Sequence, residues 1–279
     1  MALPKLNSSP EYTLTIPSTG QEVKYRPYLV KEEKVLMMAA ESQDEKQMFN
    51  AIINTLKACI KDDINENQLA IFDVEYMFTQ VRSKSTGELI KLQPKCESCE
   101  KDNHAAIKLD DLKVSMPKDL NNVIKLTDNI SIKMRWPSYR DVVSGDYSAN
   151  EQTKSTFTLM GKCIDTIVTN DEQISMIDVP ENETQEFIEE MTSDQFTKLS
   201  AFLEKMPRLK HDIEFKCTGC GKENKLSLEG LQAFFFFFFF FSSKTCDNSS
   251  STMIWMDSFL ELPQFLAPTL RHLTRAPEA

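Results

Sequence analysis

The strongest constraint on this sequence is a cysteine motif that occurs twice, at Lys95–Asn103 and again at Lys216–Asn224. Both copies read K-C-x-x-C-x-K-acid-N. Two residues between the cysteines let both sulfurs of one turn point at a single ion, and two such turns supply the four tetrahedral ligands that zinc prefers. Because the flanking residues repeat as well, the signal is stronger than a lone C-x-x-C. We predict one structural zinc ion held by Cys96, Cys99, Cys217 and Cys220.

Three alternatives compete with four thiolate ligands. Structural disulfides belong to exported proteins, and Met1–Leu6 lacks the apolar core of a secretory signal. A thioredoxin-like redox motif would be a single C-x-x-C in a βαβ context, whereas each pair here lies between strand-like runs. His104 and His211 are close enough in sequence to replace one thiolate each, so they remain possible alternative ligands.

The two copies differ at the residue after the second cysteine. Gly221 holds this position in the second copy, and Glu100 holds it in the first. Such turns often require a positive φ, which costs a non-glycine residue about 1 kcal/mol. Glu100 therefore either accepts this strain or gives the first turn another geometry.

The chain before the first motif indicates a hairpin followed by helices. Residues 1–10 are polar and are expected to form a flexible arm. Tyr12–Ile16 and Glu22–Arg26 alternate as strands around a Pro-Ser-Thr-Gly turn. Apolar spacing then predicts one helix from Lys31, with Val35, Leu36 and Ala39 inward, and two more over about 44–60 and 72–82. Cys59 is expected to be a core residue.

Residues of about 113–210 form an excursion between the two motifs, which we expect to be mainly helical. A strand is predicted at Ile130–Trp136, and a helix from about Asn150 that carries Cys163 and Ile167 on its buried face. A short strand containing Ile174 and two further helices over about 183–191 and 194–206 follow. The overall prediction is an α+β fold, with an N-terminal hairpin and two zinc knuckles on strand pairs, in a single zinc-stapled domain over 11–232.

The last part of the chain, residues 233–279, differs in composition from the rest. It opens on eight consecutive phenylalanines, Phe234–Phe241, and continues with a segment rich in Ser, Thr and Pro. The phenylalanine run has no amphipathic period and is too short to span a bilayer. We interpret the tail as disordered or read out of frame, with a hydrophobic anchor that docks on a partner as the alternative.

Charge and motif content exclude several functions. The chain carries 32 Lys and Arg against 42 Asp and Glu, a net charge of −10. This balance disfavours nucleic acid as a partner, because such binding depends on basic groups that neutralise phosphates. No apolar run approaches the length of a membrane span, and no glycine-rich phosphate loop is present. A saturated zinc site and the absence of a catalytic triad spacing also argue against an enzyme and a small-molecule substrate.

The N-terminal region resembles a known family. The strings Leu14–Gly20 and Lys24–Lys34, together with Phe72–Tyr76, are similar to the base plate proteins of T-even-type tailed bacteriophages. The resemblance covers roughly residues 5–233. It implies a structural or assembly role in the baseplate hub, with hub proteins as partners. It also implies a location in the cytoplasm of the infected bacterium or in the virion baseplate.

The expected function is therefore a structural or chaperone-like role in hub assembly, exerted through protein–protein contacts. The alternative is a zinc-ribbon nucleic-acid-binding protein. Arg26, Tyr28 and Lys31 follow the hairpin at an element boundary and are the predicted contact residues. For them, burial of Tyr28 in the core and simple solvation of the two charges is an equally supported interpretation.

Overall fold

The computed structural model describes residues 10–42, 44–65, 68–114, 116–117, 121–144 and 152–229 of the 279-residue chain. The predictions for residues 1–9 of the arm, for the phenylalanine run and for the tail lie outside this part. The described residues group into two compact units. Of the described residues, the first unit contains 10–65, 72–114 and 208–229, and the second contains 68–71 and those between 116 and 207.

The N-terminal hairpin of the first unit consists of β1 (Tyr12–Thr15) and β2 (Glu22–Tyr25), paired antiparallel. Its turn is closed by backbone bonds from the Gly20 and Ile16 amides, at 2.8 and 2.9 Å. Gly20 has φ +70°, a conformation that costs glycine nothing. The hairpin expected from the alternating sequence is therefore present.

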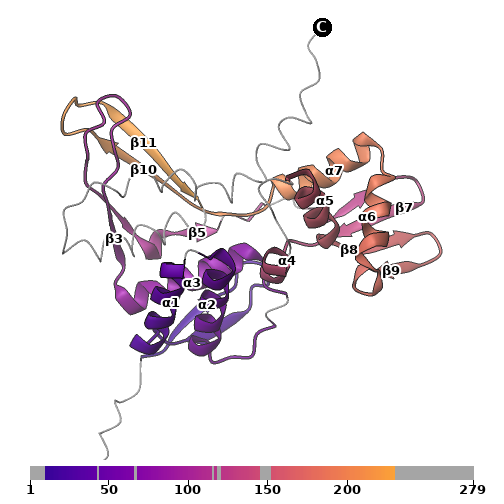
Figure 1. Ribbon diagram of the computed structural model, residues 1–279, viewed down its shortest axis with the longest axis horizontal. Coiled ribbons are helices and arrows are strands. Elements are labelled where there is room, and N and C mark those ends of the chain that lie inside the picture. Colours follow the sequence, from indigo (N-terminus) through magenta and orange to yellow (C-terminus); the bar gives the residue numbers. More distant parts are fainter. Residues whose placement is uncertain are drawn as a thin grey trace, which may run out of the picture. The chain divides into compact units, whose positions relative to one another are not determined.

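Three helices pack beside this hairpin: α1 (Val30–Ser42), α2 (Glu45–Cys59) and α3 (Ile71–Thr86) (Figure 1). The Asp44 side chain caps α2 by accepting from the amides of Lys46 and Gln47. Asp73, in the first turn of α3, accepts from the amide and hydroxyl of Ser18 at 2.9 and 2.6 Å, which fixes the hairpin turn. The largest fully buried side chains here are Ile16, Tyr25, Leu36, Ile52, Leu56, Phe72, Met77 and Phe78.

The orientation of α1 differs from the prediction. Leu36 and Ala39 are buried as expected, but Val35 is 47% exposed. The buried face of α1 includes Glu32 instead, which is 7% exposed and accepts from Arg26 and from the Leu29 amide. Because the Glu32 carboxylate is hydrogen-bonded, it can be buried, and the buried face of α1 therefore differs from the one that apolar spacing predicts.

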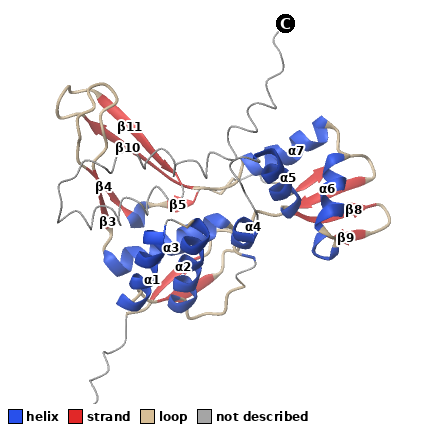
Figure 2. Cartoon of the chain, in the orientation of Figure 1, coloured by secondary structure: helices blue, strands red, loops and turns tan. Residues whose placement is uncertain are grey.

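Two further hairpins complete the first unit. One pairs β3 (Leu89–Leu92) with β4 (Ala105–Lys108). After a 3-10 turn (Leu109–Asp111) and the short β5 (Lys113–Val114), the other pairs β10 (Leu209–Lys216) with β11 (Glu223–Glu229) (Figure 2). The strand order of the second sheet is β11-β10-β5. One buried cluster joins the two hairpins: Ile90, Leu92, Ile107, Leu109, Leu112, Leu209, Ile213 and Leu228.

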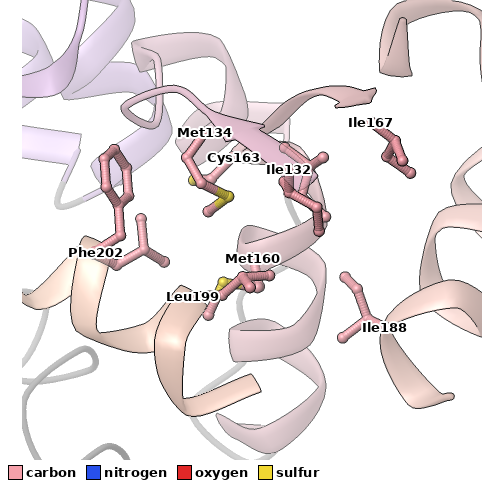
Figure 3. Close-up of a cluster of buried hydrophobic side chains, with 10 residues drawn as sticks. Ile132, Met134, Met160, Cys163, Ile167, Ile188, Leu199 and Phe202 are labelled. Carbon is pink, nitrogen blue, oxygen red and sulfur yellow. The ribbon is translucent and has the colours of Figure 1, made fainter. Parts of the chain in front are cut away.

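The second unit has its own sheet and core. Four antiparallel strands lie in the order β6 (Val123–Lys125), β7 (Ile130–Met134), β8 (Ile164–Thr169) and β9 (Gln173–Ser175). The helices are α4 (Tyr139–Ser144), α5 (Gln152–Lys162), α6 (Glu181–Glu189) and α7 (Ser193–Glu204), with a 3-10 turn at Met176–Asp178. Figure 3 shows Met160 of α5, Ile188 of α6 and Leu199 of α7 in the cluster that includes Ile132 and Met134 of β7.

Within its described residues, the excursion thus carries a four-stranded sheet beside its helices, and one element differs from the prediction. The helix expected to continue to Ile167 ends at Lys162, and Ile164–Thr169 is a strand. Five of its six residues, Ile164, Thr166, Ile167, Val168 and Thr169, are β-branched, which favours the pleated conformation. This segment buries a core of its own, in keeping with the grouping of the described chain into two compact units.

Candidate metal centre

Each cysteine pair lies in the turn of one antiparallel hairpin of the first unit. Cys96 and Cys99 lie between β3 and β4, and Cys217 and Cys220 lie between β10 and β11. Apolar residues that alternate along these strands point into the shared core. The burial of one face of each hairpin thus fixes the position of both turns, which we call the first and the second knuckle.

The two knuckles have the same backbone hydrogen bonds. In each, the amide of the first cysteine donates to the carbonyl of the lysine five residues later. The amide of the residue before that lysine donates back to the carbonyl of the first cysteine. The bonds are Cys96–Lys101 at 3.0 Å, Glu100–Cys96 at 2.9 Å, Cys217–Lys222 at 2.9 Å and Gly221–Cys217 at 3.0 Å.

Glu100 adopts the same left-handed conformation as its counterpart. Its φ is 56°, against 74° for Gly221. Of the two outcomes that the sequence left open, the first knuckle therefore keeps the common geometry and accepts the strain of a non-glycine residue at positive φ.

The four cysteine sulfurs of the knuckles lie within 4.8 Å of one another. The Sγ atoms of Cys96 and Cys220 are 3.6 Å apart, and those of Cys99 and Cys217 are 3.5 Å apart. A tetrahedron with Zn–S bonds of about 2.3 Å has sulfur–sulfur edges of about 3.8 Å. A disulfide would need a sulfur–sulfur distance of about 2.05 Å, and these four cysteines form no disulfide. The cluster could therefore hold a metal ion.

Backbone amides prepare two of the thiols as ligands. The amides of Cys220 and Gly219 donate to Cys217 and lower the pKa of its thiol to about 6. The Ser98 amide likewise lowers the pKa of Cys96. For Cys99, the amide of Lys101 acts in the same direction, but the facing thiols of Cys217 and Cys220 outweigh it and raise the pKa to about 11. A bound cation would supply the charge needed to deprotonate such a thiol.

The asparagine that ends each motif joins the two knuckles. Asn103 is 2% exposed, its Nδ2 donates to the Lys101 carbonyl at 2.8 Å, and its Oδ1 accepts from the Thr218 amide at 2.8 Å. Asn224 is 6% exposed and makes the equivalent pair of bonds. Its Nδ2 donates to the Lys222 carbonyl at 2.9 Å, and its Oδ1 accepts from the Glu97 amide of the first knuckle at 3.2 Å. Each buried amide thus holds its own turn and the opposite one.

Sequence reasoning missed the role of these asparagines, although their signal was present. The motif repeats beyond the cysteines, and a shared polar residue outside the ligand set indicates a residue that orients the ligands. Gly219 has a separate local reason. A Cβ at this position would approach the Lys101 Cδ to 2.6 Å, so a larger residue there would require the Lys101 side chain to shift.

The two histidines lie apart from the sulfur cluster. His104 is exposed just before β4, and His211 lies in β10 opposite Leu228. His211 precedes Cys217 by six residues of extended chain, about 20 Å. Within the described residues, the group that could hold a metal consists of the four cysteines and includes neither histidine.

The predicted contact residues have different surroundings. Tyr28 is 9% exposed and its amide donates to Ser85, so it belongs to the core. The Arg26 side chain is 17% exposed and donates to Glu32 at 2.9 Å. Burial of Tyr28, one of the two interpretations that the sequence left open, is thus what the structure has, and Arg26 is paired with the buried Glu32 where either interpretation would have it exposed. Lys31 is the exposed one, with 73% of its side chain accessible.

The remaining described cysteines have no part in this cluster. Cys59 and Cys163 are fully buried, as expected of core residues. Burial raises the pKa of Cys59 to about 11 and that of Cys163 further still, so both thiols stay neutral.

Across the described residues, no helix combines the length and the apolar character that a membrane span requires.

Comparison with known proteins gives one family and one relative. The family model of the T4 bacteriophage base plate protein matches residues 9–236. The chain is 24% identical over 225 residues to the baseplate hub assembly protein gp26 of Enterobacteria phage T4, covering 80% of this chain and 97% of that protein. No solved structure matches the chain. Because the family model spans most of the sequence, including both knuckles, the chain belongs to the T4 bacteriophage base plate protein family.

Proposed function

We propose that this protein acts in the assembly of a phage baseplate hub, through protein–protein contacts and without catalysing a reaction. The observation that carries this proposal is the family match over residues 9–236. The relative in phage T4, whose name describes a baseplate hub assembly protein, is matched over 97% of its length. Hub proteins are then the partners, and the site of action is the infected bacterium during tail assembly or the virion baseplate.

The metal that we propose for the knuckles is zinc in a structural role. Four thiolates in a tetrahedral arrangement favour zinc over the hard cations, which prefer oxygen ligands. With four protein ligands, the ion would have no open position for water or substrate. Its contribution would be to hold the β3–β4 and β10–β11 hairpins together at their turns, where the shared apolar core is absent.

A nucleic-acid-binding role is the less favoured alternative. A net charge of −10 opposes binding to phosphates. Two lysines in and beside the second motif are paired with acidic groups as well, since Lys222 lies 3.7 Å from Glu97 and Lys225 lies 3.2 Å from Asp212. These pairs reduce the positive charge that the second knuckle offers to a phosphate backbone.

The proposal is tested in infected cells. A phage that carries Cys217→Ser in this gene should accumulate incomplete baseplates, because the variant cannot close the sulfur cluster. The intact tagged protein should recover tail components in a pull-down. His104→Ala, at an exposed position beside the first knuckle, serves as the control and should assemble normally. Recovery of nucleic acid in place of tail proteins, at moderate salt, would favour the alternative role.

A further inference from the structure

The outer face of α1 exposes apolar side chains to an unusual degree. Five of the large hydrophobic residues exposed in the described chain fall between residues 29 and 38: Leu29 at 44%, Val30 at 79%, Val35 at 47%, Met37 at 46% and Met38 at 59%. The opposite face of α1 is already used, because Leu36 and Ala39 are buried. Grouped exposed apolar residues of this kind mark contact surfaces, and methionine is frequent in them.

The charges on this face follow a particular order. Lys34 and Glu41 are both exposed and are seven residues apart, which is two turns or about 10 Å along the helix. At 100° per residue they lie on nearly the same line of the helix surface, and this line passes between Met37 and Met38. The face thus reads positive, apolar, negative along its length.

This order is complementary to itself. When a second copy of α1 lies antiparallel across the first, with a two-fold axis between Met37 and Met38, the methionines of both copies meet at the centre. Lys34 of each copy then lies opposite Glu41 of the other. A symmetric pair of this kind uses the same patch on both partners, and each contact occurs twice.

The helix dipole supports the same arrangement. Glu41 lies in the last turn of α1, where a negative charge is unfavourable, and the last turn contains no basic residue. In the antiparallel pair, Lys34 of the other copy approaches this end and offsets the unfavourable charge. Lys31, with 73% of its side chain exposed, lies near the opposite end, but its Nζ is 3.4 Å from the Glu32 carboxylate of the same helix, so the pairing rests on Lys34.

We propose that this α1 face, Val30–Glu41, is the self-association surface of the protein and that its occupant is the α1 face of a second copy. One helix face buries less area than a standard interface, so the dimer is weak and its population depends on concentration. The proposal depends neither on the metal site nor on the baseplate role.

Charge reversal in the full-length protein tests the pairing directly. Lys34→Glu alone, or Glu41→Lys alone, places two like-charged pairs in the symmetric dimer. Each should raise the dissociation constant by about tenfold or more, measured by sedimentation equilibrium. In an equimolar mixture of the two variants every pair is opposite in charge, so the heterodimer should form with nearly the original affinity.

Matched controls separate this effect from net charge. Lys91→Glu, at an exposed position in β3, changes the net charge as Lys34→Glu does and should leave association unchanged. The two α1 variants shift the net charge in opposite directions, so a loss of association in both is local. Circular dichroism should show unaltered folds, as all three positions are exposed.

Three results would overturn the proposal. A protein that stays monomeric at all concentrations would leave the face to a different protein. A dimer that both α1 variants retain must use another surface. Two single variants that lose association and do not recover it when mixed would show that Lys34 and Glu41 do not face each other.

Discussion

Asn103 accepts a hydrogen bond from the Thr218 amide at 2.8 Å, although 115 residues separate the two positions along the chain. The Glu97 amide makes the reciprocal bond to Asn224, at 3.2 Å. The two bonds together link the knuckles independently of any ion. The sulfur cluster is therefore preorganised by two buried amides, which determine the spacing of the ligands before a metal binds.

The first prediction concerns this cross-link. Asn103→Ala should remove the side-chain bonds to the Lys101 carbonyl and to the amide and hydroxyl of Thr218, and leave the Thr218 amide without its partner. The expected cost is about 1–3 kcal/mol in unfolding free energy. The affinity for zinc should fall about 10- to 100-fold, as it does when a residue that orients ligands is lost. Chelator competition and urea denaturation measure the two effects. Ser98→Ala, exposed in the same knuckle, is the control, and an unchanged affinity in Asn103→Ala would contradict the assigned role.

A second prediction concerns the metal itself. Purified protein should contain about one zinc ion per chain, and Cys96→Ser or Cys220→Ser should lower zinc content and thermal stability together, because binding is coupled to folding. Removal of the ion by a chelator should lower the Tm, and added zinc should restore it. If the metal-free protein kept its full stability, the structural role proposed for zinc would be wrong.

The third prediction uses the strained position of the first knuckle. Glu100→Gly should stabilise the protein by about 0.5–1 kcal/mol, since a φ of 56° is strained for glutamate and unstrained for glycine. Gly221→Ala should destabilise it by about the same amount or more. Urea denaturation of both variants gives the comparison, and a loss of stability in Glu100→Gly would mean that the glutamate side chain has a stabilising contact.

The fourth prediction concerns acid sensitivity of the second unit. Burial alone would raise the pKa of Asp141. Hydrogen bonds from Arg135, at 2.6 and 3.1 Å, and from Ser138 have the larger, opposite effect, so the pKa lies below its ordinary value. Because the folded pKa is depressed, the stabilisation is present above pH 4 or so and is lost as the pH falls through the folded value.

Asp141→Asn tests this linkage. It should cost about 1–3 kcal/mol at pH 7, and the difference from the original protein should shrink as the pH falls below about 4. Unfolding free energies measured from pH 3 to pH 7 provide the data. A constant difference across this range would show that the charge of Asp141 does not contribute.

The sequence predicted some elements of the fold for clear physical reasons. The hairpin of β1 and β2 and the helices α2 and α3 have strong periods and recognisable turn or cap residues. The convergence of four cysteines followed from repeated spacing alone. Zinc as the bound ion stays a prediction, as do the contact role of Lys31 and the origin of the tail.

The misses have local causes. Ile164–Thr169 continues the apolar pattern of α5, and only its β-branched composition distinguishes a strand from a further turn of helix. The short strand β6 contains three residues, too few to establish a period. Val35 and Arg26 were misplaced for one reason: the carboxylate of Glu32 is buried and accepts from Arg26, so Glu32 rather than Val35 lies on the buried face of α1.

The separation of the two knuckles also has a consequence for protein synthesis. The paired sulfurs are 124 and 118 residues apart. At about 5–20 residues per second, the ribosome adds the second pair roughly 6–25 s after the first. During this interval Cys96 and Cys99 are two ligands of an incomplete set, while the whole second unit emerges between them. A nascent chain therefore samples the second unit's fold before it can capture an ion, and any polypeptide released early retains two unpaired thiols.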